Sequence, residues 1–274
     1  MKIGVCAPAN RIDPGTAAKA AAFVAVAYPQ VDLIVHPQCF REDGGHFAGP
    51  DEARAAAFLE LANDPGIDAI WFARGGYGSN RILHTVIPQL NVAARAKSYV
   101  GYSDMGFMLG ALYAAKIGHP VHGPMMIDIG HRIGGDVTVA RSLDWLVKRG
   151  RAGLEPSLDG KRPAAAFNLS ILTTLIGTQW LPDLTDHVLM IEDVSEPLYR
   201  IDRMLFQMAH ATQLKGIAGV RMGRVTEVPP NEPTWQGTPV EMVARWCAEV
   251  GVPFFGPADI AHDGDNKVVP FGIA

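Results

Sequence analysis

The sequence predicts an α/β protein, and two observations point to this fold class. In the first half of the chain, short apolar segments alternate with longer helical segments, which is typical of a parallel sheet covered by helices on both faces. Between residues 127 and 163 this pattern loosens, and glycines surround a single helical segment. We therefore expect an α/β domain at residues 1–130, a linker at 131–163 and a second domain of different character at 164–274.

Each expected strand of the first half is followed by an expected helix. The first helix is rich in alanine and stops before Pro29, a residue that a helix interior does not accept. Asp51 and Glu52 fall in the first turn of the second helix, where the helix dipole favours acidic side chains. In chain order, the expected strands span 3–7, 31–35, 69–73 and 98–100, and the expected helices span 15–27, 50–61, 79–86 and 105–116.

The second half begins with a continuous apolar run at residues 188–191, which we interpret as a buried strand. The other expected strands span 216–220, 252–255 and 268–271, and the expected helices span 201–211 and 241–250, while the helical segment of the linker spans 139–148. In a parallel sheet, functional residues lie in the loops just past the carboxyl ends of strands. Both the segment 74–78 and Ser103 occupy such positions.

The composition is that of a globular protein and excludes several classes of function. Of 274 residues, 48% are hydrophobic and 19% are charged, so the chain is long enough to bury one large core or two medium ones. The net charge of −4, without a dense stripe of Lys or Arg, argues against a nucleic-acid partner. The alanine-rich run at 17–27 is interrupted by Lys19, so it predicts a helix and not a membrane span.

Three cysteines, Cys6, Cys39 and Cys247, are odd in number and far apart, without the paired spacing of a metal site. They indicate buried thiols in a reducing compartment. The apolar part of the N-terminus is too short for a secretory signal and is better interpreted as a first buried strand. We expect a cytoplasmic protein.

Ser103 lies at the most informative feature of the sequence, an expected junction between a strand and a helix. The β-type run that ends at Gly101 turns at Ser103 directly into the apolar helical pattern that starts at Met105. A serine on a strand–turn–helix corner presents its hydroxyl beside the free N–H groups of a helix N-terminus. This is the geometry of a nucleophile elbow, although the spacing is Gly-x-Ser-x-x-Gly. The alternative is that Ser103 only caps the helix.

A glycine-rich segment, Gly75-Gly76-Tyr77-Gly78, also joins an expected strand to an expected helix. Glycines allow backbone N–H groups to approach a phosphate or a developing oxyanion closely. A dinucleotide fingerprint would require a glycine where Arg81 stands. The alternative is a tight turn between strand and helix.

Two acidic residues, Glu192 and Asp193, end the apolar run at 188–191. A carboxylate at a buried strand tip is unfavourable unless a cation or a hydrogen-bond donor meets it, and an imidazolium meets that need. The alternative is an ion pair with Arg200 or Arg203 nearby. Because side chains alternate along a strand, only one of the two acids is expected to face a functional site.

His262 differs from the other eight histidines because it lies in a polar loop between two late strands, where catalytic side chains are usually found. Ser103, Glu192 and His262 then form a candidate set of nucleophile, acid and base, which enzymes assemble from distant positions in any order. The closely spaced His119 and His122 lack a clear third ligand, so a zinc site is not expected.

Several separated motifs resemble the LD-carboxypeptidase family, the murein tetrapeptide carboxypeptidases, almost from end to end of the chain. They are Phe47 to Arg54, Arg74 to Arg81, Gly101 to Asp104, His122 to Met125, Asn168 to Ser170, Ile191 to Val194 with Tyr199 to Leu205, and Gly256 to His262 followed by Asn266 and Pro270. The resemblance implies a flavodoxin-like α/β N-terminal domain, a smaller, strand-rich α+β C-terminal domain, and a homodimer.

The resemblance also implies the roles of the site residues. Ser103 is the nucleophile, His262 the base and Glu192 the acid that orients it, while the backbone N–H groups of Gly76 and Asp104 form the oxyanion hole. The implied activity is release of the terminal D-alanine from a murein tetrapeptide during cell-wall recycling, without a metal or an organic cofactor. Candidates for substrate binding are Arg74, Arg81 and Asn168, and the sequence does not choose between the two arginines for the substrate carboxylate.

Two departures from the family pattern bear on the substrate. Ala166 and Phe167 precede Asn168 where the family usually has glycines, and the connection at 126–165 is short. The same fold serves microcin-immunity hydrolases, which cut an amide in an aminoacyl-nucleotide conjugate, so an amidase of that type is an alternative. A non-catalytic module that binds a phosphorylated ligand at residues 75–78 is another.

Overall fold

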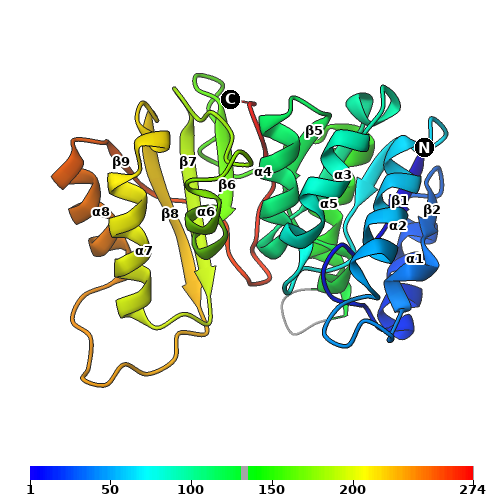
Figure 1. Ribbon diagram of the computed structural model, residues 1–274, viewed down its shortest axis with the longest axis horizontal. Helices are drawn as coiled ribbons and strands as arrows, with labels where there is room; N and C mark the ends of the chain where they lie inside the picture. The colour runs from blue at the N-terminus through cyan, green and yellow to red at the C-terminus, as the bar shows by residue number, and fades with distance from the viewer. Residues whose placement is uncertain (131–134, 274) are drawn as a thin grey trace.

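The computed structural model describes residues 1–130 and 135–273, and its strands form two sheets that lie in the two halves of the molecule (Figure 1). The first sheet has the order β10-β5-β4-β3-β1-β2. Strands β1 to β5 are parallel, and β10 runs antiparallel to β5. The bounds are β1 Lys2–Val5, β2 Asp32–Val35, β3 Ala69–Trp71, β4 Ser98–Gly101, β5 His119–His122 and β10 Val269–Pro270.

The expected parallel sheet of the first half is confirmed, with two differences. Strand β5 was not expected, because His119-Pro120-Val121-His122 contains only one β-branched apolar residue. The late strand expected at 268–271 exists as β10, but it completes the N-terminal sheet. After passing through the second half, the chain therefore returns to the sheet of the first half.

The helices of the first half begin and end for local reasons. Asp13 caps α1 (Pro14–Ala27) by accepting a hydrogen bond from Thr16 N, with Pro14 at the first helical position. The expected helix at 79–86 is a 3-10 turn followed by one turn of α-helix. The other helices are α2 Asp51–Asn63, α3 Leu83–Val86, α4 Gly106–Ala114 and α5 Asp136–Lys148.

The second sheet has the order β6-β7-β8-β9, and all its strand pairs are parallel. Its helices α7 and α8 alternate with β7, β8 and β9, so the second half is also built on the α/β principle. The bounds are β6 Ala164–Asn168, β7 Val188–Val194, β8 Gly219–Thr226, β9 Phe254–Pro257, α6 Leu169–Leu175, α7 Leu198–His210 and α8 Pro239–Val250.

The two halves share a hydrophobic core. Helix α4 packs closely on α6, since a Cβ added at Gly106 would lie 3.1 Å from Ile171 and one at Gly110 would lie 3.1 Å from Leu175. Close helix packing of this kind requires small residues at the contact. The division at residues 130 and 163 stays a prediction, and the expected linker contains the 13-residue helix α5.

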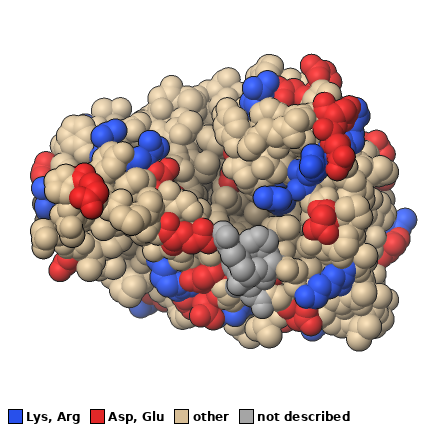
Figure 2. All heavy atoms as spheres, turned by 90° about the horizontal axis from the view of Figure 1, so that it is seen from below, with Lys and Arg blue, Asp and Glu red and all other residues tan. Residues whose placement is uncertain are grey.

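The state of the cysteines, the character of the helices and the surface charges can be compared with the expectations drawn from composition. All three cysteines are free and buried. None of the helices in the described part of the chain combines the length and the apolar character that crossing a bilayer requires. Figure 2 views the end of the molecule toward which β7 and β8 point, where acidic and basic side chains are interspersed around a hollow between the two halves.

Candidate active site

Ser103 lies at the carboxyl end of β4 with a backbone φ of 59°, a left-handed conformation that non-glycine residues rarely adopt. Its side chain does not cap the following turn, because Tyr102 and Met105 occupy the cap positions and neither turn has a side-chain cap. A strained conformation of this kind costs about 1–3 kcal/mol, and such residues cluster at active sites and ligand-binding sites. The geometry favours the nucleophile elbow over the helix cap.

The glycine segment packs against the serine turn. A Cβ added at Gly75 would lie 3.0 Å from Ser103 Cβ and 3.4 Å from Asp104 N, so only glycine permits this approach. The buried Asp104 carboxylate accepts hydrogen bonds from Gly78 N at 3.2 Å and Ser79 N at 2.9 Å. Burial raises the pKa of Asp104. The carboxylate therefore fastens the glycine segment to the residue that follows the serine.

Gly76 has a φ of 106°, and a Cβ there would lie only 2.5 Å from the Asn10 side chain. The guanidinium of Arg54, which is fully buried, donates to the carbonyl oxygens of Gly78, at 2.9 Å, and Pro8. Sequence reasoning missed both supports. Arg54 could have been found from the sequence, because it ends the Phe47 to Arg54 motif. Asn10 belongs to no motif that the sequence analysis identified.

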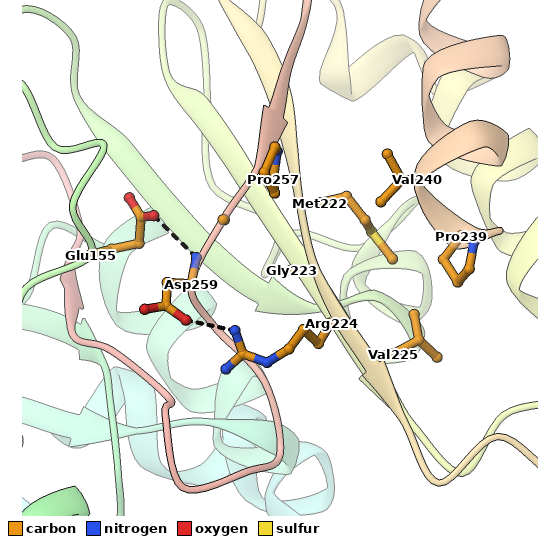
Figure 3. Close-up of a pocket in the computed structure, with 10 residues that line it drawn as sticks. Glu155, Met222, Gly223, Arg224, Val225, Pro239, Val240, Pro257 and Asp259 are labelled. Carbon is orange, nitrogen blue, oxygen red and sulfur yellow. Dashed lines mark hydrogen bonds and ion pairs between the residues drawn. The ribbon is translucent and has the colours of Figure 1, made fainter.

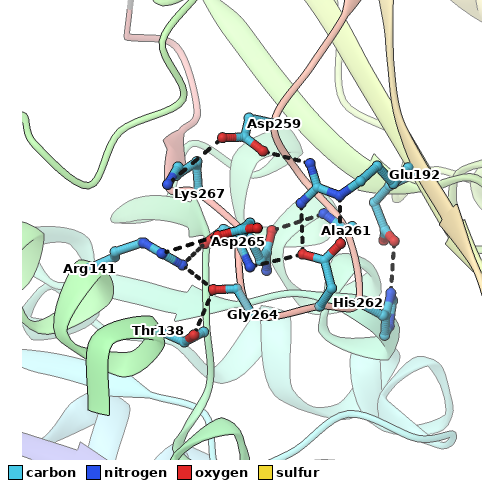
Figure 4. A network of polar contacts seen from close by, with 12 residues as sticks. Thr138, Arg141, Glu192, Asp259, Ala261, His262, Gly264, Asp265 and Lys267 are labelled. Atoms are coloured by element: carbon cyan, nitrogen blue, oxygen red, sulfur yellow. Dashed lines mark hydrogen bonds and ion pairs between the residues drawn. The ribbon is translucent and has the colours of Figure 1, made fainter. Parts of the chain in front are cut away.

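Glu192 and His262 form a hydrogen-bonded pair, with Glu192 Oε2 2.7 Å from His262 Nδ1 (Figure 4). The pairing of β7 with β8 shifts register between Ile191 and Asp193, so Glu192 sits at an irregularity in the sheet. When Nδ1 carries the proton that Glu192 accepts, the other ring nitrogen is left as a base. Nε2 has no hydrogen-bond partner among the described residues.

The charge environment of His262 favours a base of raised pKa. Burial lowers the pKa of His262, but the charge and the hydrogen bond of Glu192 outweigh burial and raise it above the ordinary value. Glu192 does not pair with either arginine of the alternative, since Arg200 pairs with Glu196 at 2.5 Å and the Arg203 guanidinium lies over the Tyr199 ring, 5.4 Å from its centroid.

Tyr102 and Asp128 support the histidine ring, and sequence reasoning missed them. The rings of Tyr102 and His262 lie 4.8 Å apart, and Tyr102 OH donates to Asp128 Oδ1 at 3.0 Å. Asp128 Oδ2 also accepts from Met125 N at 2.8 Å, and burial raises the pKa of Asp128 to about 6. Tyr102 is the neighbour of Ser103, but no pattern relates Asp128 to it.

Asp193, the neighbour of Glu192, has a separate set of partners. Its carboxylate accepts from Asn168 Nδ2 at 2.9 Å, Ser170 N at 3.0 Å and Val194 N at 2.8 Å. Burial raises the pKa of Asp193 to about 7. The two adjacent acids thus contact different parts of the second half, as alternation along a strand requires.

Ser103 and His262 line one cavity of about 290 Å³. Its walls come from the first half, through the glycine segment and residues 125–128, and from the second half, through the ends of β7 and β8 and the His262 loop. The lining residues are Arg74, Gly75, Gly76, Tyr102, Ser103, Met125, Ile127, Asp128, Val194, Ser195, Glu227 and His262. The described residues hold no cluster of His, Cys, Asp and Glu suited to a metal ion.

The three expected substrate-binding residues lie in different places. Arg74 lines the cavity and donates to Arg11 O at 3.3 Å. Arg81 pairs with Asp51 at 2.9 Å and does not line the cavity. Asn168 caps α6. Its side-chain amide forms hydrogen bonds with Ile171 N, Ser170 Oγ and the Asp193 carboxylate.

Comparison with known proteins relates this chain to one family. The model of the LD-carboxypeptidase N-terminal domain matches residues 3–123, and that of the LD-carboxypeptidase C-terminal domain matches residues 165–274. A Synechocystis protein named as a candidate carboxypeptidase, slr1534, is 30% identical over 87% of this chain and 79% of its own. The murein tetrapeptide carboxypeptidase of Pseudomonas aeruginosa is 26% identical over 83% of this chain and 78% of its own.

Solved structures share the fold across nearly the whole chain. The muramoyltetrapeptide carboxypeptidase of Oxalobacter formigenes superposes with a TM-score of 0.79 at 21% identity, covering 99% of this chain and 93% of that one. The protein MccF in complex with glutamyl sulfamoyl guanosine gives 0.80 at 18% identity, covering 99% and 91%. With both domain models matched in order, the chain belongs to the LD-carboxypeptidase family.

Proposed function

We propose that the protein is a serine-type LD-carboxypeptidase that releases the terminal D-alanine of a murein tetrapeptide in peptidoglycan recycling. One observation carries the proposal: His262, which pairs with Glu192 and whose Nε2 has no partner among the described residues, lines the same cavity as Ser103. The name of the Pseudomonas aeruginosa relative supports the substrate class. The bond cut would join the L-centre of diaminopimelate to D-alanine.

The proposed reaction proceeds through an acyl-enzyme. His262 Nε2 takes the proton from Ser103 Oγ while the oxygen attacks the scissile carbonyl carbon. The C–N bond then breaks, and His262 returns the proton to the departing D-alanine amine. His262 Nε2 then takes a proton from water as the water oxygen attacks the ester carbon, and it returns that proton to Ser103 Oγ when the ester C–O bond breaks and the tripeptide leaves. Glu192 holds the Nδ1–H tautomer and stabilises the imidazolium that forms twice in each cycle.

The oxyanion is proposed to be stabilised by the backbone N–H groups of Gly76 and Asp104. The approach of Gly75 to the Ser103 turn supports this role, and the Asp104 carboxylate keeps the glycine segment in place. Each such donor is worth about 10²–10³ in turnover when it is fixed before the reaction starts. Residues far from the serine thus contribute by holding these two donors still.

Arg74 is the proposed binding group for the free carboxylate of the terminal D-alanine. It is the one arginine among the residues that line the described cavity, and its guanidinium donates to a neutral carbonyl, Arg11 O. Arg81 already pairs with Asp51, a carboxylate that it shares with Arg54. A guanidinium matches a carboxylate through two parallel hydrogen bonds, which makes the terminus a specificity element.

An amidase of the microcin-immunity type is the second candidate, because the fold superposes on MccF as well as on a tetrapeptide carboxypeptidase. The same three side chains would cut an aminoacyl-nucleotide conjugate. A non-catalytic phospholigand module has less support, because the N–H group of Gly78, one of the donors at residues 75–78, already binds the Asp104 carboxylate, as does that of Ser79.

The deciding experiment is incubation with synthetic L-Ala-γ-D-Glu-diaminopimelate-D-Ala and detection of free D-alanine. The matched substrate control is the same peptide ended by an amide, and the matched protein control is Ser103→Ala. An aminoacyl sulfamoyl nucleoside is tested in parallel. We expect D-alanine from the wild type alone and a fluorophosphonate adduct on Ser103. Release from the nucleoside conjugate only would assign the amidase function, and no labelling of Ser103 would refute a serine hydrolase.

The proposal includes a homodimer and a cytoplasmic location, which the family resemblance and the cysteine content suggest. Light scattering of the purified protein tests the dimer, and cell fractionation tests the location. A monomer at working concentration, or recovery of the protein outside the cytoplasm, would remove the corresponding part of the proposal without affecting the chemistry.

A further inference from the structure

The loop that carries His262 is fastened to strand β8 by Arg224, a residue with no role in the chemistry proposed above. Nε and Nη2 of Arg224 donate to the two carboxylate oxygens of Asp263 at 2.5 and 2.7 Å, and Nη1 donates to Asp259 Oδ1 at 2.6 Å. Asp263 directly follows His262, and Asp259 precedes it by three positions. One guanidinium therefore joins the two sides of the loop.

The backbone of β8 reinforces this contact. Arg224 N donates to Ile260 O at 3.0 Å. A Cβ added at Gly223 would lie 2.5 Å from Ile260 O and 3.0 Å from Glu192 Cβ, so β8 touches the loop and the acid of the pair at the same residue. Strand β8 thus sets the distance between Glu192 and the loop that carries its partner histidine.

Arg224 acts from outside the proposed active site. It lines a separate cavity of about 510 Å³ together with Glu155 and Asp259, and it is not among the residues that line the cavity of Ser103 (Figure 3). The polar groups of this outer cavity are engaged with one another, since Asp259 N donates to Glu155 Oε1 at 3.1 Å. Arg224 is therefore placed to hold the loop and not to touch the substrate.

A second attachment keeps the loop in place on its other side. Thr138 Oγ1 and Arg141 Nη1, both on α5, donate to Gly264 O at 2.7 and 2.6 Å (Figure 4). Arg141 Nη1 also donates to Asn266 O at 3.1 Å. Because these contacts remain when Arg224 is replaced, we expect a local shift of the His262 side of the loop and not its detachment.

We propose that Arg224 is a positioning residue for the catalytic base, an inference that rests on the proposed function of His262. Its planar fork holds Asp259 and Asp263 in one geometry, which a lysine ammonium does not reproduce. This arrangement keeps His262 Nδ1 within hydrogen-bond distance of Glu192 and holds His262 at the wall of the cavity that Ser103 also lines. A displacement of about 1 Å at a reacting group lowers turnover by about 10²-fold.

The experiment compares Arg224→Met and Arg224→Lys with a matched control, Arg221→Met. Arg221 lies on the same strand and fastens β9 by donating to Phe255 O and Pro257 O, but it does not contact the loop. We expect Arg224→Met to lower kcat by about 10–100-fold with KM changed less than about threefold, Arg224→Lys to give an intermediate value, and Arg221→Met to retain the wild-type kcat.

A second measurement does not depend on activity. A proton shared between His262 Nδ1 and Glu192 gives a far-downfield resonance in the proton NMR spectrum, which His262→Gln identifies by its absence. We expect this resonance to be lost or shifted in Arg224→Met and kept in Arg221→Met. If Arg224→Met does not fold, Asp263→Asn, which breaks the two-pronged contact, replaces it with the same expected outcome.

The two measurements separate this inference from the proposed function. An inactive wild type would refute the proposed function, while the resonance would still report whether Arg224 sets the position of His262. Wild-type kcat and an unchanged resonance in Arg224→Met would overturn the inference. An equal loss of kcat in Arg221→Met would do so as well, because it would show a general effect of weakening the second sheet.

Discussion

At the scale of single residues, Ser103 and His262 are expected to act as one unit. Ser103→Ala and His262→Ala should each lower kcat/KM by several orders of magnitude, and the double variant should be little worse than either single one, because both remove the same step. Steady-state rates of D-alanine release measure this. Losses that multiply in the double variant would show that the two residues serve different steps.

Glu192 and Asp193 differ in contacts, so their variants should differ in effect. Glu192→Gln keeps the shape of the side chain but removes the charge that stabilises the imidazolium, and it should cost less than Ser103→Ala. Asp193→Asn should be milder still, because Asp193 contacts α6 and not His262. A larger loss of kcat in Asp193→Asn would show that the acid of the triad is wrongly assigned.

The pH profile gives an independent view of the Glu192–His262 pair. Glu192 favours the protonated ring and thereby raises the pKa of His262, and Asp128 and Asp193 act in the same direction. The acid limb of kcat/KM, where the base loses its proton, should therefore lie above the ordinary histidine pKa of about 6.5. Removing the charge in Glu192→Gln should move that limb to lower pH. An acid limb that stays in place would separate Glu192 from the titration of the base.

Arg74 is expected to act on substrate affinity. Arg74→Ala should raise KM for the tetrapeptide by about 10-fold or more, the value for one lost charge-assisted contact, and should leave the KM of a weakly cleaved amide-ended peptide unchanged. Arg81→Ala is the matched control. A rise in KM in Arg81→Ala alone would transfer the carboxylate site to Arg81.

At the scale of elements, Asn168 connects α6 with β7. Asn168→Ala removes the N-cap of α6 and one partner of Asp193, so the free energy of unfolding should fall by about 1–2 kcal/mol. Urea unfolding measures this, with Ser170→Ala as a control that removes only one contact of the Asn168 amide. If stability is unchanged and KM rises, Asn168 binds substrate, as the family resemblance implies.

The parallel strands were predictable where the sequence places branched apolar residues in short runs before a glycine or a turn. Strand β5 and the alanine-rich β6 were not, since proline, histidine and alanine carry little β-propensity and the neighbouring strands decide their conformation. In the candidate site, Ser103 could be identified from its strand–turn–helix corner, and Glu192 from its position at the end of an apolar strand. Asp128 and Arg224 act through residues distant in sequence, so no spacing in the chain identifies them.

At the scale of the whole molecule, both halves must be present for activity. A chain that ends near Gly150 retains Ser103 but lacks Glu192, His262 and the edge strand β10, so it should release no D-alanine. The full chain should stay active in EDTA, because the proposed steps use only side chains and backbone N–H groups. Activity of the shortened chain, or loss in EDTA that zinc restores, would contradict the mechanism.

The pairing of β10 with β5 imposes an order of events on synthesis. Strand β5 leaves the ribosome long before residues 269–270, and at about 5–20 residues per second the interval is about 7–30 s. Throughout that time the nascent sheet has an open edge, a feature that invites pairing with other chains. Pro120 in β5 lacks an N–H group and so weakens this edge as a template. On the proposed mechanism, the nascent chain carries its serine without a base until His262 is translated, a few residues before the edge is closed.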